Sequence, residues 1–166
     1  MKLKILFTII LFTFASLGSA DELRKAVDSE DRSEKNIVRD EFRKPYETLS
    51  FFQLEPDMTI VELSPGGGWY TEILANFIRK SGNLIAAHFS KDSDRAYFRD
   101  SRINFEKKVK ENNLYEKVTV VDLNSELSDP SSVDAVLTFR NLHNWLGPNM
   151  DKIFSNSYVA LKPGGL

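Results

Sequence analysis

The chain of 166 residues contains no cysteine and only two histidines, His88 and His143. Without cysteine there can be no disulfide, no thiol nucleophile and no cysteine-ligated zinc, and two histidines cannot build a histidine-rich metal centre. An excess of basic residues is also missing, since 22 Lys and Arg stand against 24 Asp and Glu, for a net charge of −2. We therefore expect neither a metal site nor a nucleic-acid partner.

A hydrophobic run long enough to cross a membrane is absent as well. The apolar stretch 5–15 is shorter than the roughly 20 residues that span a bilayer. It follows Lys2 and Lys4 and precedes the small residues 18–20, a pattern typical of a cleaved secretory signal peptide ending near Ala20. The sequence thus predicts an exported, periplasmic protein with no membrane contact after cleavage.

Beyond this leader, apolar strand patterns alternate with amphipathic helix patterns. Strands are expected at 58–63, 84–89, 118–123 and 133–139, and helices at 69–80, 92–112 and 149–161. The helix at 92–112 is expected to bury Tyr97, Ile103, Phe105 and Val109. This alternation predicts an α/β fold with a Rossmann-like, doubly wound parallel sheet. We divide the chain into a signal peptide at 1–20, an N-terminal helical arm at 21–57, with one helix beginning at Asp40, and an α/β domain at 58–166.

The first strand leads directly into a glycine turn, Ser64-Pro65-Gly66-Gly67-Gly68, that opens the next helix. Such a turn lets a ligand approach the backbone at the positive end of a helix. A dinucleotide fingerprint would need a small residue where Trp69 stands, and a nucleoside-triphosphate loop would need a lysine after Gly68. The spacing therefore argues against both.

Residues 62–68 have the form of an acidic residue followed by G-x-G-x-G, with Ser64 in place of the first glycine. They resemble the first motif of class I S-adenosylmethionine-dependent methyltransferases. Three more landmarks agree: Asp122 at the end of the third strand, the D-x-V-h pattern at 134–137, and Leu-Lys-Pro-Gly-Gly at 161–165. Segments 39–45 and 137–143 resemble a group of exported bacterial proteins predicted to be methyltransferases.

The resemblance implies S-adenosylmethionine as the cofactor. The acidic residue and the glycine turn would hold its methionine part, Asp122 would lie near its adenine, and Tyr70 would line the same cleft. At the end of the second strand, where this class has a carboxylate for the ribose, His88 either makes a hydrogen bond to the ribose or is an ordinary strand-end residue. The predicted cofactor residues are Glu62, Ser64, Gly66, Gly68, Tyr70, His88 and Asp122.

The segment after the fourth strand faces the transferred methyl group if ligands bind at the carboxyl ends of the strands. There His143 is the candidate general base, and Arg140 or Asn141 would orient a substrate. A purely structural alternative pairs Arg140 with a carboxylate, caps a turn with His143 and packs Trp145 under a helix.

These observations favour a methyltransferase acting on an unidentified small molecule. The alternatives are a non-catalytic exported binding module with the same fold, or an inactive fragment; a dehydrogenase is disfavoured by Trp69. The resembling class has seven strands, ordered 3-2-1-4-5-7-6, and only four are predicted here, in the order 3-2-1-4. We therefore expect a truncated chain or a partner that supplies the rest, with an uncovered edge on the fourth strand that permits self-association.

Overall fold

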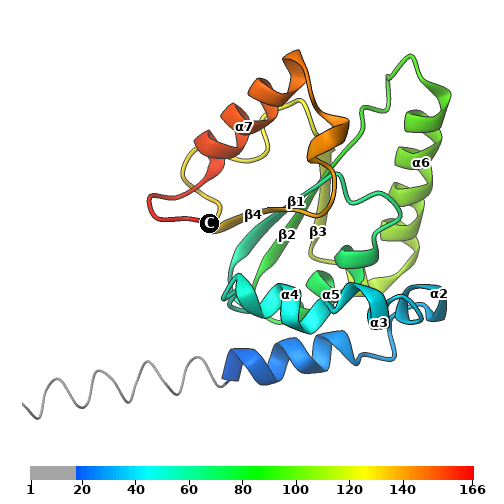
Figure 1. Cartoon of the computed structure of the whole chain (residues 1–166), viewed down its shortest axis with the longest axis vertical. Coiled ribbons are helices and arrows are strands. Elements are labelled where there is room, and N and C mark those ends of the chain that lie inside the picture. The colour runs from blue at the N-terminus through cyan, green and yellow to red at the C-terminus, as the bar shows by residue number, and fades with distance from the viewer. Residues whose placement is uncertain (1–17) are drawn as a thin grey trace, which may run out of the picture.

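A four-stranded parallel sheet forms the centre of the computed structural model, which describes residues 18–166 (Figure 1). Its strands are β1 (Thr59–Leu63), β2 (Asn83–His88), β3 (Val118–Asp122) and β4 (Ala135–Thr138), in the order β3-β2-β1-β4. The predicted Rossmann-like α/β sheet and its order are confirmed. Most of the predicted signal peptide lies outside the described residues.

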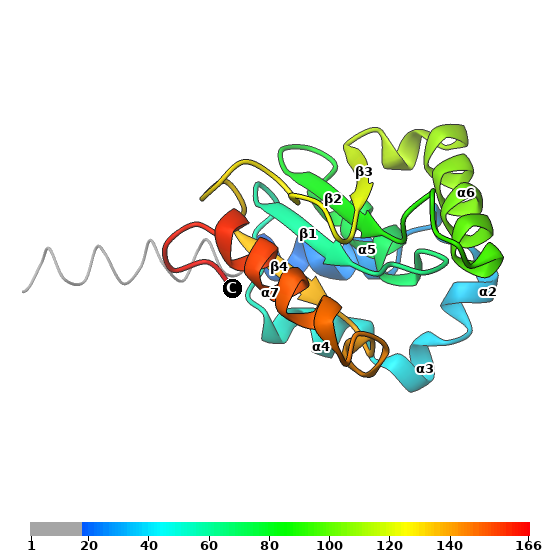
Figure 2. The same ribbon diagram turned by 90° about the horizontal axis from the view of Figure 1, so that it is seen from above.

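Helices cover both faces of the sheet, as the doubly wound prediction requires (Figure 2). On one face lie α5 (Trp69–Ile78) and α6 (Ala96–Glu111), followed by the turn η1 (Asn113–Tyr115). On the other face lies α7 (Pro148–Ala160), after the turn η2 (Leu142–Asn144). Alternate residues of β1 face opposite sides of the sheet. Ile60 is buried in the core beneath α5, and Val61 is buried in a second core on the side of α7.

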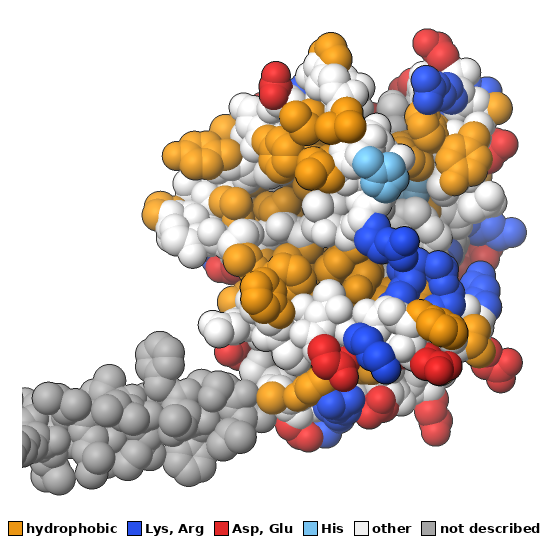
Figure 3. Space-filling model, in the orientation of Figure 1, with side chains coloured by type: hydrophobic (Ala, Val, Ile, Leu, Met, Phe, Trp, Pro, Cys, Tyr) orange, Lys and Arg blue, Asp and Glu red, His pale blue; other side chains and the backbone are white. Residues whose placement is uncertain are grey.

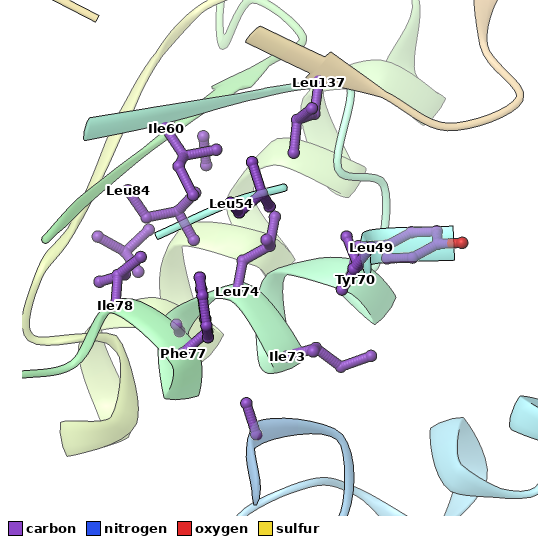
Figure 4. Close-up of a cluster of buried hydrophobic side chains, with 14 of the residues drawn as sticks. Leu49, Leu54, Ile60, Tyr70, Ile73, Leu74, Phe77, Ile78, Leu84 and Leu137 are labelled. Carbon is purple, nitrogen blue, oxygen red and sulfur yellow. The ribbon is translucent and has the colours of Figure 1, made fainter. Parts of the chain in front are cut away.

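The larger core surrounds α5, whose residues are almost all buried. Leu74 and Ile78 of this helix pack toward Ile60 and Leu84 of the sheet, and Leu49 of the N-terminal arm closes the cluster (Figure 4). Because α5 begins directly after the glycine turn, this packing fixes the turn against the sheet.

The N-terminal arm folds over α5 as a chain of short helices. They cover residues 18–27, α2 (Glu34–Ile37), α3 (Asp40–Arg43) and α4 (Pro45–Phe51). The expectation of one helix beginning at Asp40 is wrong, because Lys44 adopts a left-handed conformation (φ 45°) between α3 and α4. The proline that follows disfavours a right-handed helical conformation at Lys44, and Pro45 instead begins α4.

The apolar pattern assigned to α6 is only half right. Phe105 is buried, but Tyr97 and Ile103, predicted to face the core, are 73% and 56% exposed. The buried position is taken by Arg102, whose guanidinium donates to the carbonyl of Val121 at 2.6 Å. A charged side chain that satisfies strand-end carbonyls leaves no apolar signature in the sequence.

The outer edge of β4 is not fully uncovered, contrary to expectation. The backbone of Val136 donates to the carbonyl of Leu166 at 2.8 Å, and Leu166 donates to the carbonyl of Asp134 at 3.0 Å. Val133 also forms an isolated parallel bridge with Leu161. Over this stretch residues near the end of the chain hydrogen-bond to the outer edge of β4, so part of the backbone N–H and C=O groups of that edge are paired.

Gly82 allows α5 to turn tightly into β2. A Cβ atom there would lie 2.5 Å from the carbonyl oxygen of Met58 and 2.7 Å from that of Pro56, both backbone atoms. We expect Gly82→Ala to lower the free energy of unfolding by about 2 kcal/mol, as overpacking of a tight site does. Gly67→Ala, at a position with open space, is the control. Equal urea midpoints for the two variants would contradict the close approach.

Candidate functional site

A cleft of about 640 Å³ opens where β1 and β4 end, between the glycine turn and the N-terminal arm. We call it the loop cleft. Seven of the predicted site residues line it: Glu62, Ser64, Gly66, Tyr70, Arg140, Asn141 and His143. Gly68, His88 and Asp122 do not. The fold thus brings residues from two separate strand ends to one cavity, as the sequence analysis expected.

The glycine turn has a backbone that passes three times through the left-handed region. Ser64, Gly66 and Gly68 have φ angles of 55°, 58° and 80°. Ser64 therefore keeps the conformation that glycine adopts most readily, at the cost of some strain. At Gly68 a Cβ would lie 3.1 Å from Phe105, whereas above Gly66 the space is open. The turn presents a bare backbone to the cleft.

Glu62 is a fully buried carboxyl that lines the loop cleft. Thr71 donates a hydrogen bond of 2.6 Å to it from the first turns of α5. Burial raises the pKa of Glu62 to about 7, although the Thr71 hydroxyl and the charge of Lys108 oppose that shift. A carboxyl held in this way is suited to a cationic group of a ligand, which would stabilise its ionised form.

His88 has both ring nitrogens engaged with the backbone, which favours the structural one of its two expected roles. Nδ1 accepts from the amide of Phe89 at 2.8 Å, so Nε2 carries the hydrogen and donates to the carbonyl of Gly66 at 3.1 Å. Burial lowers the pKa of the ring, which keeps it neutral. The side chain therefore holds the glycine turn in place and has no nitrogen free for a ribose hydroxyl.

Asp122 ends β3 as predicted, but its carboxylate serves the following turn. Oδ1 accepts from the amide of Asn124 at 2.8 Å, and the residue is not part of the loop cleft. Gly68 likewise acts through conformation, because it directly precedes α5.

The segment after β4 is tied to the glycine turn. Asn141 Nδ2 donates to the carbonyls of Ser64 at 3.2 Å and of Phe139 at 3.0 Å, which uses both of its amide hydrogens. Arg140 has a left-handed backbone (φ 62°) and no carboxylate partner among residues 18–166. The structural alternative therefore fails for Arg140, but Trp145 is buried in the second core as that alternative expected.

The N-terminal arm contributes two arginines to the loop cleft, although none of the predicted site residues lies in the arm. Arg39 and Arg43 line the loop cleft from α3 and the residue before it. The Arg43 guanidinium lies over the Trp69 ring, 4.6 Å from its centroid, and Trp69 Nε1 donates to the carbonyl of Asn36 at 2.8 Å. The four-residue spacing of the two arginines was the available signal, since it predicts a common helix face.

A second cavity of about 580 Å³ lies on the other side of the glycine turn, beside α6. Lys108 lines it and links three elements: its Nζ donates to Glu72 Oε1 of α5 at 2.8 Å and to the carbonyl of Gly67 at 3.1 Å. Ser33 of the arm donates to the same Glu72 oxygen at 2.9 Å. These hydrogen bonds connect the glycine turn to α5, α6 and the N-terminal arm.

The match to a known family model shows which family the chain belongs to. Residues 61–166 match the family model described as a methyltransferase domain. The chain belongs to the methyltransferase domain family.

Solved structures with the same methyltransferase fold agree. A SAM-dependent methyltransferase from Aquifex aeolicus has a TM-score of 0.62 and 20% identity, covering 82% of this chain and 66% of that one. A putative S-adenosyl-L-methionine-dependent methyltransferase from Methanococcus maripaludis has a TM-score of 0.55 and 15% identity, with coverages of 82% and 64%. A SAM-dependent O-methyltransferase from Thermotoga maritima has a TM-score of 0.53 and 19% identity, covering 74% of this chain and 41% of that one.

These identities establish a common fold, and the chain spans about two thirds or less of each of these structures. No curated protein matches the sequence.

The methyltransferase family and these neighbours support S-adenosylmethionine as the cofactor. The residues of the loop cleft fit that group. A bare glycine turn admits a ligand close to the backbone, and the Glu62 carboxyl provides a negative partner for a sulfonium or ammonium group. The buried Ser64 hydroxyl has no hydrogen-bond partner within residues 18–166, so it is free to bond to a ligand.

Proposed function

We propose that the chain transfers a methyl group from S-adenosylmethionine to a small molecule bound in the loop cleft. The observation that carries the proposal is that one cavity joins the glycine turn and Glu62, at the end of β1, to Arg140, Asn141 and His143, after β4. Ligands of open parallel sheets bind at such carboxyl ends. The glycine turn with Glu62 and the proposed acceptor-side residues therefore line one space.

Bound S-adenosylmethionine would supply an electrophilic methyl group on its sulfonium: a lone pair of the acceptor would form the new bond to this carbon as the S–C bond breaks, and the electron pair of that bond would stay on sulfur. His143, exposed at the cleft, would take the proton of an acceptor that carries one. Arg140 would orient the acceptor by a charge-assisted hydrogen bond. Asn141 acts differently from our expectation: with both amide hydrogens on backbone carbonyls, it positions the β4 segment and leaves only Oδ1 for a ligand.

Calorimetric titration of the purified full chain with S-adenosylmethionine and S-adenosylhomocysteine tests the proposal. We expect both to bind, and Gly66→Asp to weaken binding at least tenfold, because a side chain and a negative charge enter the open space above the turn. Gly164→Asp is the matched control, since Gly164 also has a positive φ (82°) and open surroundings. Absence of binding below millimolar concentration, with Gly66→Asp indistinguishable from the parent, would defeat the cofactor assignment.

A binding module that transfers nothing is the second candidate. The end of β2 favours it, because the position of the ribose carboxylate is taken by His88, whose nitrogens are occupied. Incubation with S-adenosylmethionine and a panel of small-molecule acceptors separates the two candidate functions. A methyltransferase forms S-adenosylhomocysteine with at least one acceptor, whereas a binding module binds S-adenosylmethionine and forms no S-adenosylhomocysteine.

We also propose that the protein is exported after cleavage near Ala20. What supports this is that the part of the helix at 18–27 that follows the predicted site contributes Leu23, Ala26 and Val27 to the core, so the mature domain would keep most of its arm. No helix within residues 18–166 is long and apolar enough to cross a membrane. Sequencing the N-terminus of the protein recovered from the periplasm tests the site, and an uncleaved Met1 in a cytoplasmic fraction would refute it.

A further inference from the structure

Three arginines of the loop cleft have no carboxylate partner within residues 18–166. They are Arg39, Arg43 and Arg140. Lys35 also lines the cleft without a carboxylate partner in that range, whereas Arg32 holds Asp40 at 2.6 Å and Lys108 holds Glu72 at 2.8 Å. On the face shown in Figure 3, Lys and Arg side chains gather beside a histidine near the middle of the molecule. The cleft is therefore cationic in a chain whose net charge is −2.

Arg39 and Arg140 lie close enough to Arg43 for their positive charges to act on its guanidinium group. Burial lowers the pKa of Arg43, and the positive charges of Arg39 and Arg140 lower it further. The arrangement persists because separate elements hold the side chains: Arg43 is stacked on Trp69, and Arg140 follows β4 with its left-handed backbone. Repulsion of this kind is relieved when an anion binds between the charges.

Neutral hydrogen-bonding groups in the same cleft are also without partners. Asn36 is 7% exposed and lines the cleft, and its Nδ2 donor makes no well-formed hydrogen bond in the part of the chain that is described, although it lies near enough to the Glu72 carboxyl to lower the pKa of that group. The buried Ser64 hydroxyl has no hydrogen-bond partner within residues 18–166. Buried polar groups are rarely left unpaired, so a ligand with acceptor oxygens is the natural complement of this cleft.

We infer that the methyl acceptor is a small organic acid, whose carboxylate or phosphate is held by Arg39, Arg43 and Arg140. Planar guanidinium groups match both anions with paired hydrogen bonds. The inference rests on the proposed function and narrows its substrate class. The carboxylate of the cofactor itself carries one negative charge, which leaves the cleft with cationic groups in excess.

The test uses the full chain saturated with S-adenosylhomocysteine and titrated with benzoate, phenyl phosphate and the uncharged benzamide. We expect at least one of the two anions to bind at least tenfold more tightly than benzamide. That preference should fall at least tenfold in Arg43→Gln and in Arg140→Gln. Arg79→Gln is the control, because Arg79 is half exposed and paired with Asp31 outside the cleft. Circular dichroism establishes that each variant is folded.

The possible failures are distinguishable. If S-adenosylhomocysteine binds and benzamide binds as tightly as the anions, or none of the three binds, the acid inference is wrong while the proposed function stands. If the anions displace S-adenosylhomocysteine, the arginines hold the cofactor carboxylate, and the inference is again wrong. If S-adenosylhomocysteine does not bind, the proposed function fails and the acceptor role fails with it, even where titration without it shows anion binding.

Discussion

Glu62→Gln is expected to weaken S-adenosylmethionine binding by about ten- to a hundredfold, the loss of one charge-assisted contact of about 1.5–3 kcal/mol. The same change is expected to stabilise the free protein at pH 8. Burial raises the pKa of Glu62 from 4.5 to about 7, a penalty on the charged form of about 3 kcal/mol. Glutamine keeps a carbonyl acceptor for Thr71 and removes the buried charge, so affinity and stability move in opposite directions.

The pH dependence gives the sign of this effect. A carboxyl whose pKa is raised in the folded protein contributes stability that is complete below its unfolded value of 4.5 and is lost as the pH rises through about 7. Urea unfolding should therefore show the gain of Glu62→Gln at pH 8 and little gain at pH 4.5.

Cofactor binding should also release a proton near pH 6, because a cationic ligand favours the ionised carboxyl. Calorimetry in two buffers of different ionisation enthalpy detects this release, which Glu62→Gln should abolish. Glu116→Gln, on an exposed turn, is the control. An unchanged cofactor affinity together with an unchanged pH profile would show that Glu62 does not face the ligand.

The fold was predictable where local pattern and burial coincide. The β1 segment is β-branched and apolar because it is buried on both faces, and the helix after the glycine turn has its apolar residues at helical spacing. The errors arose where long-range contacts decide. Arg102 is buried because its guanidinium donates to strand-end carbonyls. The interruption at Lys44 is a local effect instead, because the adjacent Pro45 disfavours a helical conformation there.

The residues of the site that directly follow β1 and β4 could be predicted from the sequence. The carboxyl ends of β1 and β4 meet in any parallel sheet in which the strands are neighbours, so Glu62 and His143 were expected to face one cleft. The contribution of Arg39 and Arg43 depends on how the arm folds back over the start of α5, where Arg43 lies over the Trp69 ring. The reassignment of His88 likewise needed the position of the Gly66 carbonyl, which only the structure gives.

Lys108→Met should lower the free energy of unfolding by about 3 kcal/mol, as expected when one partner of a buried ion pair is removed. Glu72 is 2% exposed and would keep a charge without its main partner. Burial raises the pKa of the Glu72 carboxyl, but the hydrogen bonds from Lys108, Asn36 and Ser33, together with the charge of Lys108, overcome that effect and hold the pKa below its ordinary value. Lys107→Met is the control, because its pair with Glu111 is exposed and contributes about 0.5 kcal/mol or less.

The pH profile of Lys108→Met should reverse in sign. In the parent, Glu72 contributes stability above its unfolded pKa of 4.5, which is lost as the pH falls through its lower folded value. Without Lys108 the folded pKa rises above 4.5, so acidification then stabilises the variant through this group. Urea unfolding at pH 4 and pH 8 measures the reversal, and a parallel profile for the two proteins would refute it.

A double variant separates the ion pair from the support that Lys108 gives to the glycine turn. Lys108→Met with Glu72→Gln removes both charges and should recover most of the lost stability. It should not recover cofactor affinity, because the bond from Lys108 Nζ to the Gly67 carbonyl remains absent. Glu72→Gln alone keeps that bond and should bind the cofactor more tightly than the double variant. Equal affinities of these two variants would show that Lys108 stabilises the fold without positioning the turn.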